Sequence, residues 1–393
     1  MTTQVLIAGG GIGGLAAGLA CSRAGCQVRL YERAEAFGEV GAGIQMGPNV
    51  VRLLQGWDLD AALRAVAAYP ERLQVRHALS GAELGVLRLG QTTVQRYGAP
   101  YATIHRADLH QLLLAALQQR ERVQLRLRHT LDAFETGADA VRLRFADGLE
   151  VEGDALLGAD GLWSRVRSQL LNDGPPRVAG HLAYRAMLPQ ASLPAALRSQ
   201  QVTAWLGPRL HVVQYPVRGG AWLNVVAIVH GHVHGGLEDW DHSANTADLQ
   251  AALAHTCGAR RALIEAVPDW RLWVLCDRPP VAGADQMARG RVALLGDAAH
   301  PMRPYLAQGA GMAIEDAAEL GRQLAQADGV LDVPTLLQRY ALNRWQRNAR
   351  VQARSIRNGA IFHLDGPLAR GRDAALRLLG ERLLDVPWLY QGP

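Results

Sequence analysis

The sequence predicts an α/β protein in which a parallel sheet is interrupted by an inserted antiparallel sheet and followed by C-terminal helices. Three observations support this fold class. A strand, a glycine-rich turn and a helix open the chain, two later buried strands each end in an acidic residue, and a run of further strands lies between those two. Apolar residues make up 49% of the 393 residues and charged residues 20%, which is an ordinary globular composition.

The composition excludes several classes of protein. The chain has no lysine, so all 41 basic residues are arginine, which excludes Schiff-base chemistry and any catalytic lysine. The net charge of +5 is spread without a basic block, so we expect no nucleic-acid partner. No apolar run is long enough to span a bilayer, and the N-terminus lacks the basic stretch of a signal peptide. We therefore expect no membrane partner. The spacing of the four cysteines fits neither a metal site nor a redox pair, so we expect a cytoplasmic protein with reduced cysteines, which are Cys21, Cys26, Cys257 and Cys276.

The N-terminal segment has the pattern of a Rossmann-type nucleotide-binding turn. The elements expected there are a strand at 4–8, a helix at 15–24 and a second strand at 27–31. Gly9, Gly11 and Gly14 occupy the GxGxxG positions, which serve a tight turn, close approach to a pyrophosphate, and helix–strand packing. Glu32 ends the second strand, where an acid binds ribose hydroxyls. This fingerprint leaves NAD and FAD open, because both contain the same ADP half.

Two later stretches favour FAD. LEVEGDALLGAD at 149–160 predicts an alternating strand and a buried strand that ends at Asp160, with Ser164 as the cap of the next helix. VALLGDAAHP begins with a strand at 292–295 and continues into Asp297, before a glycine-led helix that runs to Leu320. An NAD dehydrogenase needs no second acid at a strand end so far along the chain. The ribityl chain and ring of a flavin do offer polar groups beyond the ADP half.

The segment between these motifs predicts a separate sheet. The expected elements are strands at 183–188, 202–206, 211–215 and 221–230 and helices at 246–257 and 261–266. We therefore divide the chain into a cofactor domain at 1–175, which includes some strands of the second sheet, a substrate domain at 176–274, the rest of the cofactor domain at 275–330, and a helical region at 331–393.

At these motifs the chain resembles the single-component FAD-dependent aromatic hydroxylases, of the salicylate hydroxylase, 3-hydroxybenzoate 6-hydroxylase and 6-hydroxynicotinate 3-monooxygenase kind. The resemblance rests on the glycine fingerprint with Glu32 and on DGLWSRVR and LLGDAAHP, supported by IHRADLHQLL, YRAML and RNGAIFHLDGP, and it runs along essentially the whole chain. It implies a glutathione-reductase-like FAD domain. It also implies a monooxygenase that consumes NADH or NADPH and O2 and hydroxylates salicylate or another small hydroxybenzoate through a flavin C4a-hydroperoxide. The alternatives are a 6-hydroxynicotinate-type hydroxylase and a flavin oxidoreductase without oxygen insertion.

The resemblance also implies roles for cofactor-binding residues. Asp297 would bind the ribityl hydroxyls, Arg106 the ribityl–phosphate region, and Asp160 both flavin and nicotinamide groups. The helix that begins near Gly309 would point its N–H groups at the pyrimidine edge of the flavin, where a helix N-terminus stabilises negative charge. The residues expected at the cofactor are Gly9, Gly11, Gly13, Gly14, Glu32, Arg33, Arg106, Asp160, Gly296, Asp297, Gly309, Ala310, Gly311 and Met312.

His211 and Tyr215 are the main candidates for the chemistry. They lie four positions apart on one predicted strand, 211–215, and so share one face. Hydroxylation needs an ionised phenol, and histidine is the natural base near neutral pH, so we expect His211 as base and Tyr215 as an orienting donor. Gln45, Pro301 and Tyr305 are further candidates, on loops that the resemblance places beside the ring. No single branch of the family matches throughout, so the sequence leaves the aromatic acid open, and we expect a monomer or a homodimer.

The histidines of HGHVH at 230–234 raise the possibility of a metal site. His230, His232 and His234 would share one strand face. Glycine flanks and the lack of a fixed fourth ligand nearby favour a solvated hairpin tip instead. We therefore expect no metal.

Overall fold

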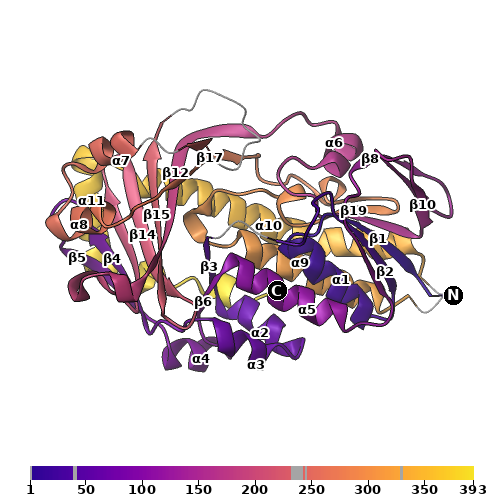
Figure 1. The fold of residues 1–393 in the computed structure, drawn as a ribbon, viewed down its shortest axis with the longest axis horizontal. Coiled ribbons are helices and arrows are strands. Elements are labelled where there is room, and N and C mark those ends of the chain that lie inside the picture. Colours follow the sequence, from indigo (N-terminus) through magenta and orange to yellow (C-terminus); the bar gives the residue numbers. More distant parts are fainter. Residues whose placement is uncertain (1, 39–41, 232–241, 244–245, 328–330) are drawn as a thin grey trace.

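Two sheets lie at opposite ends of an elongated molecule, with long helices between them (Figure 1). The computed structural model describes residues 2–38, 42–231, 242–243, 246–327 and 331–393. Within these residues no helix combines the length and the apolar character that crossing a membrane requires.

The first sheet is the parallel sheet predicted from the glycine fingerprint. Its strands, in spatial order, are β18 (Ala288–Arg289), β19 (Val292–Leu294), β11 (Ala155–Gly158), β1 (Gln4–Ala8), β2 (Gln27–Tyr31) and β7 (Val123–Arg126). All neighbours pair in parallel except β18 and β19. A Cβ at Gly14 would lie 1.9 Å from the carbonyl oxygen of Gly9, so no other residue fits there. Helix α1 (Ile12–Arg23) begins three residues earlier than expected, inside the turn itself.

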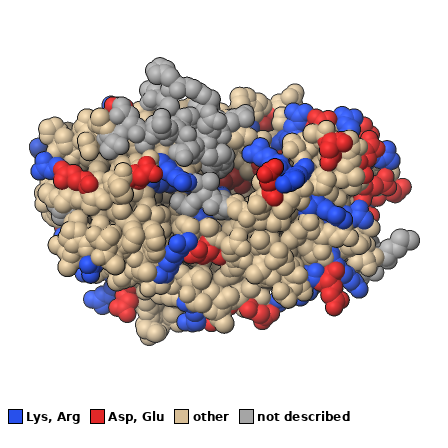
Figure 2. Space-filling model, viewed as in Figure 1, with Lys and Arg blue, Asp and Glu red and all other residues tan. Residues whose placement is uncertain are grey.

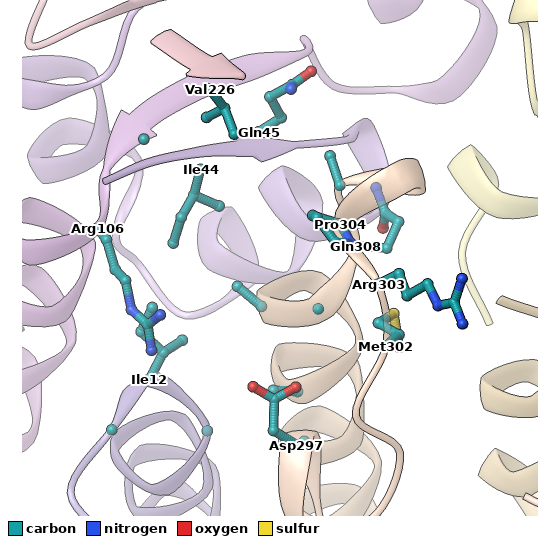
Figure 3. Close-up of a pocket in the computed structure, with 18 of the residues that line it drawn as sticks. Ile12, Ile44, Gln45, Arg106, Val226, Asp297, Met302, Arg303, Pro304 and Gln308 are labelled. Atoms are coloured by element: carbon teal, nitrogen blue, oxygen red, sulfur yellow. The ribbon is translucent and has the colours of Figure 1, made fainter. Parts of the chain in front are cut away.

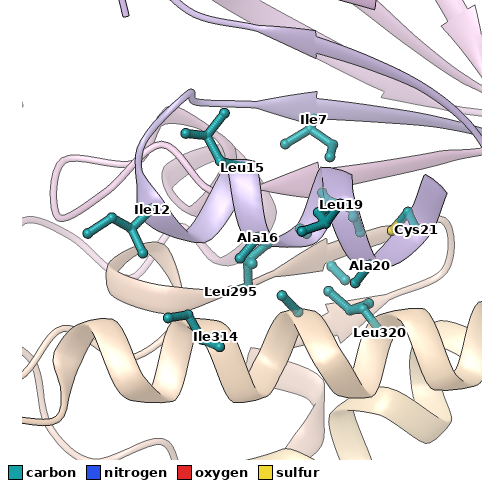
Figure 4. Packing of buried hydrophobic residues seen from close by; sticks show 14 of the residues in the cluster. Ile7, Ile12, Leu15, Ala16, Leu19, Ala20, Cys21, Leu295, Ile314 and Leu320 are labelled. Atoms are coloured by element: carbon teal, nitrogen blue, oxygen red, sulfur yellow. The ribbon is translucent and has the colours of Figure 1, made fainter. Parts of the chain in front are cut away.

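Helices α1 and α9 (Gly309–Leu324) pack side by side through buried apolar side chains (Figure 4). A Cβ at Gly13 would meet Ala313, and one at Gly321 would meet Ala20. These contacts follow the same order along both helices, so the helices run parallel. Their N-termini therefore lie at the same end, where the free N–H groups of both can face one ligand.

The second sheet has eight strands and is mixed rather than purely antiparallel. In spatial order they are β16 (His242–Ser243), β17 (Arg271–Asp277), β12 (Arg177–Pro189), β15 (Trp222–His230), β14 (Leu210–Val217), β13 (Val202–Gly207), β4 (Arg72–His77) and β5 (Glu83–Arg88). The inserted strands β12, β13, β14, β15 and β17 pair antiparallel with one another, as predicted. The sheet is mixed because β13 also pairs in parallel with β4, a strand that precedes the insertion. The fold class itself, a parallel sheet with an inserted second sheet and C-terminal helices, is confirmed. The domain boundaries stay a prediction.

Smaller strands and helices complete the fold before β17. The short strands are β3 (Gly43–Met46) with β6 (Ala102–His105), and β8 (Leu131–Thr136) with β9 (Val141–Phe145) and β10 (Glu150–Gly153). The helices are α2 (Pro48–Gly56), α3 (Asp60–Val66), α4 (Gln91–Tyr97), α5 (Arg106–Gln118), α6 (Arg165–Leu171), α7 (Thr246–Leu253) and α8 (Gly258–Glu265), and the last two lie between β16 and β17. Helix α7 ends four residues before the expected end at residue 257.

The C-terminal region is helical, as predicted, and its long first helix joins the two halves of the molecule (Figure 1). It contains α10 (Val333–Phe362), α11 (Gly366–Leu379), α12 (Glu381–Leu384) and α13 (Pro387–Tyr390). Arg344 of α10 is fully buried and donates to Glu315 and Asp316 of α9, both at 2.8 Å. The other oxygen of Asp316 accepts from the backbone N–H of Gly296 at 3.1 Å and lies 2.5 Å from His300 Nε2. One arginine thus fixes α9 and the loop after β19 together.

We expect Arg344→Met to destabilise the fold strongly. The substitution leaves Glu315 and Asp316 buried beside an apolar side chain. Breaking a buried ion pair in this way lowers the free energy of unfolding by about 3–5 kcal/mol. Urea unfolding of both proteins measures the difference. The control is Arg142→Met, which breaks an exposed pair with Glu152 and should change the free energy of unfolding by less than about 1 kcal/mol. Equal effects of the two substitutions would contradict this role of Arg344.

Candidate functional site

Two adjoining clefts form one continuous groove between the parallel sheet and the eight-stranded sheet. They share lining residues at their junction: Gly11, Arg106, Ala159, Gly161, Arg185 and Asp297. One cleft extends from there over the end of β2, and the other extends between the start of α9 and the face of β14 and β15. A long, two-part ligand therefore fits this groove better than a compact one.

Glu32 and the glycine turn form the first end of the groove. The Glu32 carboxylate accepts hydrogen bonds from the backbone N–H groups of Gly10, at 2.6 Å, and Ala34, at 2.8 Å. These bonds hold the acid at the end of β2, in the place that the fingerprint predicts for binding ribose. Gly9, Gly11 and Arg33 line the groove beside it, whereas Gly14 lies behind the turn and serves packing.

Asp160 lines the groove but its oxygens are already engaged within the protein. Oδ1 accepts from the Ser164 hydroxyl at 2.5 Å, and Oδ2 accepts from the backbone N–H groups of Arg165, at 2.7 Å, and Val166, at 3.1 Å. Asp160 therefore stabilises the start of α6, and burial raises the pKa of its carboxyl group. Ser164 is the N-cap of α6, as expected, and accepts from the Arg167 N–H at 2.8 Å. The contact of Asp160 with cofactor groups stays a prediction.

Arg106 and Asp297 face the middle of the groove from opposite sides (Figure 3). Arg106 begins α5, and its side chain extends toward Ile12 at the N-terminus of α1. Asp297 follows β19 and is exposed. Gly296 precedes it with φ at +57°, a conformation that favours glycine and turns the chain sharply at the strand end.

The first residues of α9 form the far wall of the second cleft. Gly309 and Ala310 line it, together with Gly13 of α1 and Gly296. Gly311 and Met312 lie deeper, and Met312 is fully buried. Of the four expected α9 residues, only the first two therefore face a ligand.

The opposite wall of this cleft is one face of the eight-stranded sheet. His211, Val213 and Tyr215 of β14 line it together with Val226 and Ile228 of β15. The alternation predicted for residues 211 to 215 is thus present, and it sets two polar side chains among apolar ones. A small aromatic ring fits such a wall, because apolar side chains bury its faces while a few polar groups fix its orientation.

Tyr215 and Gln45 belong to one hydrogen-bonded group at this wall. The Tyr215 hydroxyl bonds to Gln45, whose Oε1 also accepts from the Tyr101 hydroxyl at 2.7 Å. Burial raises the pKa of Tyr215, so its phenol stays protonated and can donate. Gln45 lines the cleft as expected.

His211 is buried and neutral. Its Nδ1 lies 2.7 Å from Nε2 of His363, so Nε2 of His211 is the nitrogen that stays available to a ligand in the cleft. Burial lowers the pKa of His211 to about 3, and the nearby His181 adds to this effect.

Pro301 and Tyr305 do not line either cleft, whereas their neighbours Met302 and Pro304 do. Pro301 is buried. Tyr305 lies in the short 3₁₀ turn η5 (Pro304–Leu306), which directs its side chain away from the groove to His181, 2.5 Å from the hydroxyl to Nδ1. The role beside the ring that the resemblance implies for them stays a prediction.

Arg185 is a site residue that the sequence analysis missed. It lies on β12, lines both clefts, and stacks over the Trp273 ring at 5.1 Å from the ring centroid. Burial lowers the pKa of its guanidinium, and the neighbouring Arg106 lowers it further. The signal was an arginine within the otherwise apolar strand of YRAML. Two half-buried cations at one junction favour an anionic ligand there.

Charges outside the groove are mixed. On the face that Figure 2 shows, basic and acidic side chains alternate over the described surface without a broad area of one sign.

Of the three histidines in HGHVH, His230 is described, but His232 and His234 lie outside the described residues. Among the residues that the structure does cover, ring nitrogens of His181, His230 and His363 lie within 4.8 Å of one another.

Comparison with known proteins identifies the family. Residues 2–355 match the family described as FAD binding domain. The chain belongs to this family. It is 37% identical over 395 residues to a 3-hydroxybenzoate 6-hydroxylase of Polaromonas naphthalenivorans (strain CJ2), covering 98% of this chain and 95% of the relative. It is 38% identical over 354 residues to a 6-hydroxynicotinate 3-monooxygenase of Bordetella bronchiseptica (strain ATCC BAA-588 / NCTC 13252 / RB50), covering 89% of each.

Among solved structures, that of Klebsiella pneumoniae HpxO complexed with FAD and uric acid is similar over 97% of this chain and 94% of that one. The TM-score is 0.85 and the sequence identity 27%. With this family established, the chain is an FAD-dependent monooxygenase of the aromatic hydroxylase class.

The groove fits FAD at both ends. A glycine turn that permits no Cβ, two parallel helix N-termini and Glu32 suit the ADP half, as the fingerprint requires. The exposed Asp297 and the start of α9 lie where the second half of the ligand would continue. We expect Glu32 and Asp297 to hold opposite ends of the cofactor.

We expect Asp297→Ala to lower FAD retention strongly. The substitution removes charge-assisted hydrogen bonds worth about 1.5–3 kcal/mol each, while the fold loses no contact that buries the side chain. The ratio of flavin to protein after purification, with unfolding measured in parallel, reads this out. Asp285→Ala, which removes an exposed carboxylate outside the groove, is the control and should leave the ratio unchanged. A variant of Asp297 that purifies with full flavin would contradict the assignment.

Proposed function

We propose that this enzyme hydroxylates a small hydroxylated aromatic acid of the hydroxybenzoate class, with NADH or NADPH and O2 as co-substrates. The observation that carries the proposal is the sheet face opposite the start of α9, where His211 and Tyr215 stand among apolar side chains. A reaction that consumes NAD(P)H belongs where that nucleotide is made, so we place the enzyme in the cytoplasm.

The bound flavin supplies the electrons taken from NAD(P)H and activates O2, and the chain provides the surroundings. Val213, Val226 and Ile228 pack against the aromatic ring and exclude water from it. Arg185 supports the proposal for an acid, because it places a half-buried cation where a carboxylate can bind. The N-terminus of α9 stabilises negative charge on the flavin edge.

His211 and Tyr215 would act on the substrate phenol. The free Nε2 of His211 accepts the phenol proton, and ionisation raises electron density at the ring carbons ortho and para to the oxygen. The Tyr215 hydroxyl, which stays protonated, donates to a substrate oxygen and fixes the ring in the cleft. The two side chains thus divide proton transfer and orientation between them.

A hydroxypyridine acid is the second candidate substrate. The Bordetella bronchiseptica relative, a 6-hydroxynicotinate 3-monooxygenase, is as similar in sequence as the hydroxybenzoate enzyme but over a shorter part of the chain. A ring of this size offers the same hydroxyl and carboxylate to the cleft. A flavin oxidoreductase without oxygen insertion is the third alternative.

A substrate screen tests the proposal. Hydroxybenzoates, salicylate among them, and hydroxypyridine acids are mixed with the FAD-loaded enzyme and NAD(P)H, and the product of the best compound is identified by mass. We expect a hydroxybenzoate to stimulate NAD(P)H oxidation and to gain one oxygen atom. Stimulated oxidation that yields only H2O2 from every compound would instead indicate the oxidoreductase.

We expect His211→Ala to uncouple the reaction rather than to release flavin. A general base contributes about 10²–10⁴-fold to such a step, so product per NAD(P)H consumed should fall while H2O2 rises. His255→Ala removes an exposed histidine outside the groove and is the matched control. Unchanged coupling in His211→Ala at neutral pH would show that His211 serves only packing and is not the base.

The pH dependence separates the base role from a packing role. Because the folded-state pKa of His211 is lowered to about 3, its basic form persists as the pH falls through the ordinary value of a histidine, 6.5. Coupling in the parent enzyme should therefore show no loss between neutral pH and about pH 5 that is due to this residue. In His211→Ala, coupling should recover at high pH, where the phenol ionises unaided. A defect of equal size at all pH values would contradict the base role.

A further inference from the structure

Three histidines form a hydrogen-bonded line from the cleft to the protein surface. Nδ1 of His211 lies 2.7 Å from Nε2 of His363, and Nδ1 of His363 lies 2.9 Å from Nε2 of His230. His211 is 2% exposed and lines the cleft, whereas His230 is exposed on the outside of the molecule. The line therefore has one end at the candidate base and the other in solvent.

The sheet and the long helix build this line from distant parts of the chain. His211 of β14 pairs with Ile228 of β15, and His230 lies two residues further along β15, so both histidines project from the same face. His363 directly follows α10 and lies between them. It belongs to the late segment RNGAIFHLDGP, for which the cleft itself gives no role.

Hydrogen-bond chemistry gives the line a direction. A neutral imidazole has one N–H donor and one bare nitrogen acceptor. His363 uses both ring nitrogens, so it accepts from one neighbour and donates to the other. Its two neighbours must then be oriented the same way, and the three rings have two arrangements of protons, one for each direction.

We propose that His211, His363 and His230 form a relay that carries a proton between the part of the second cleft that His211 lines and the protein surface. The proposal rests on the proposed function, because it supplies the route by which the substrate phenol loses its proton and the product regains one.

The transfer conserves every proton. In the starting arrangement Nδ1 of each histidine carries the proton, and His211 donates to His363, which donates to His230. The phenol O–H breaks as Nε2 of His211 gains a proton, and the Nδ1 proton of His211 moves to Nε2 of His363. The Nδ1 proton of His363 moves to Nε2 of His230, whose own Nδ1 proton passes to water. One proton leaves the cleft, the phenolate stays, and all three rings end neutral with Nε2 protonated.

The surroundings favour conduction of a proton over its storage. Arg209 lies near His230, Arg372 near His363 and Arg303 near His181. Arg372 is paired with Asp373, and Arg303 with Asp277. Burial lowers the pKa of all three relay histidines. Arg209 lowers the pKa of His230 further, and the neighbouring histidines and Arg372 lower that of His363 further. A ring that cannot hold a second proton for long must pass one on as it receives one.

His181 and Tyr305 flank the line. His181 pairs with His230 across β12 and β15, and the two rings lie 4.5 Å apart. Its Nδ1 bonds to the Tyr305 hydroxyl. These two residues position the rings of the relay, and this explains the direction of Tyr305 away from the cleft.

A coloured probe tests the relay without any oxygen chemistry. A nitro-substituted hydroxybenzoate, whose phenolate is yellow, is mixed rapidly with the oxidised FAD-loaded enzyme in weakly buffered, mildly acidic solution. The rate of phenolate formation and the rate of proton release to an indicator are recorded. The variants are His230→Ala, His363→Gln and, as control, His255→Ala. Glutamine can keep a hydrogen bond at position 363, but its amide does not relay protons as an imidazole does.

We expect both rates to fall by at least about tenfold in His230→Ala and His363→Gln and to be unchanged in His255→Ala. Added imidazole should restore His230→Ala, because it replaces the exposed end of the line, and should not restore His363→Gln. Flavin content and unfolding curves equal to the parent's establish that each variant is folded. Parent rates in both relay variants, or a loss in His363→Gln that imidazole restores equally, would overturn the relay. Failure of the probe to bind the parent at all would count instead against the proposed substrate class.

Zinc gives a second measurement on the parent protein. His181, His230 and His363 could also bind a metal ion, and two of these three residues belong to the relay. Zinc chloride added to the metal-free enzyme should therefore slow proton release, and a chelator should restore it. Bound zinc with unchanged proton release would overturn the relay and mark the cluster as a metal site.

Discussion

The buried ion pairs of Arg344 are the interaction on which the site depends. One guanidinium in α10 holds Glu315 and Asp316, and Asp316 in turn holds the backbone at Gly296. Burial alone would raise the pKa of Asp316, but the interactions with His300 and Arg344 outweigh it, so the pKa lies below its ordinary value and the acid stays ionised. The strand end that carries Asp297 and the helix start that faces the cleft are thereby fixed to one another.

Local patterns in the sequence were enough to predict where the cofactor half of the site lies. The glycine turn, Glu32 and the strand that leads to Asp297 each depend on residues within one element, and the structure has all three where they were expected. The alternation of His211 and Tyr215 is local too. The direction of the Tyr305 side chain is not a local property. It depends on a 3₁₀ turn that the sequence of a proline-containing loop does not predict.

What the sequence could not show is pairing between distant segments. His211 and His363 are 152 residues apart, and no periodicity in either segment indicates that α10 ends beside β14. Arg185 sits in an apolar strand, where an arginine can equally face solvent at a sheet edge. The parallel contact of β13 with β4 likewise joins residues 202–206 to residues 73–77, and a composition shift at residue 176 gave no sign of it.

That parallel contact limits how the molecule can be divided. The eight-stranded sheet ends in β4 and β5, which the chain makes before it has completed the parallel sheet. A segment cut at residue 176 would leave β13 as an open edge with unpaired N–H and C=O groups, a template for pairing with other chains. Strands separated by more than a hundred residues also join late during folding, because the loop between them must close first. The two halves of this enzyme are therefore not interchangeable modules, and transplanting its substrate sheet into a relative requires residues 72–88 to be moved with it.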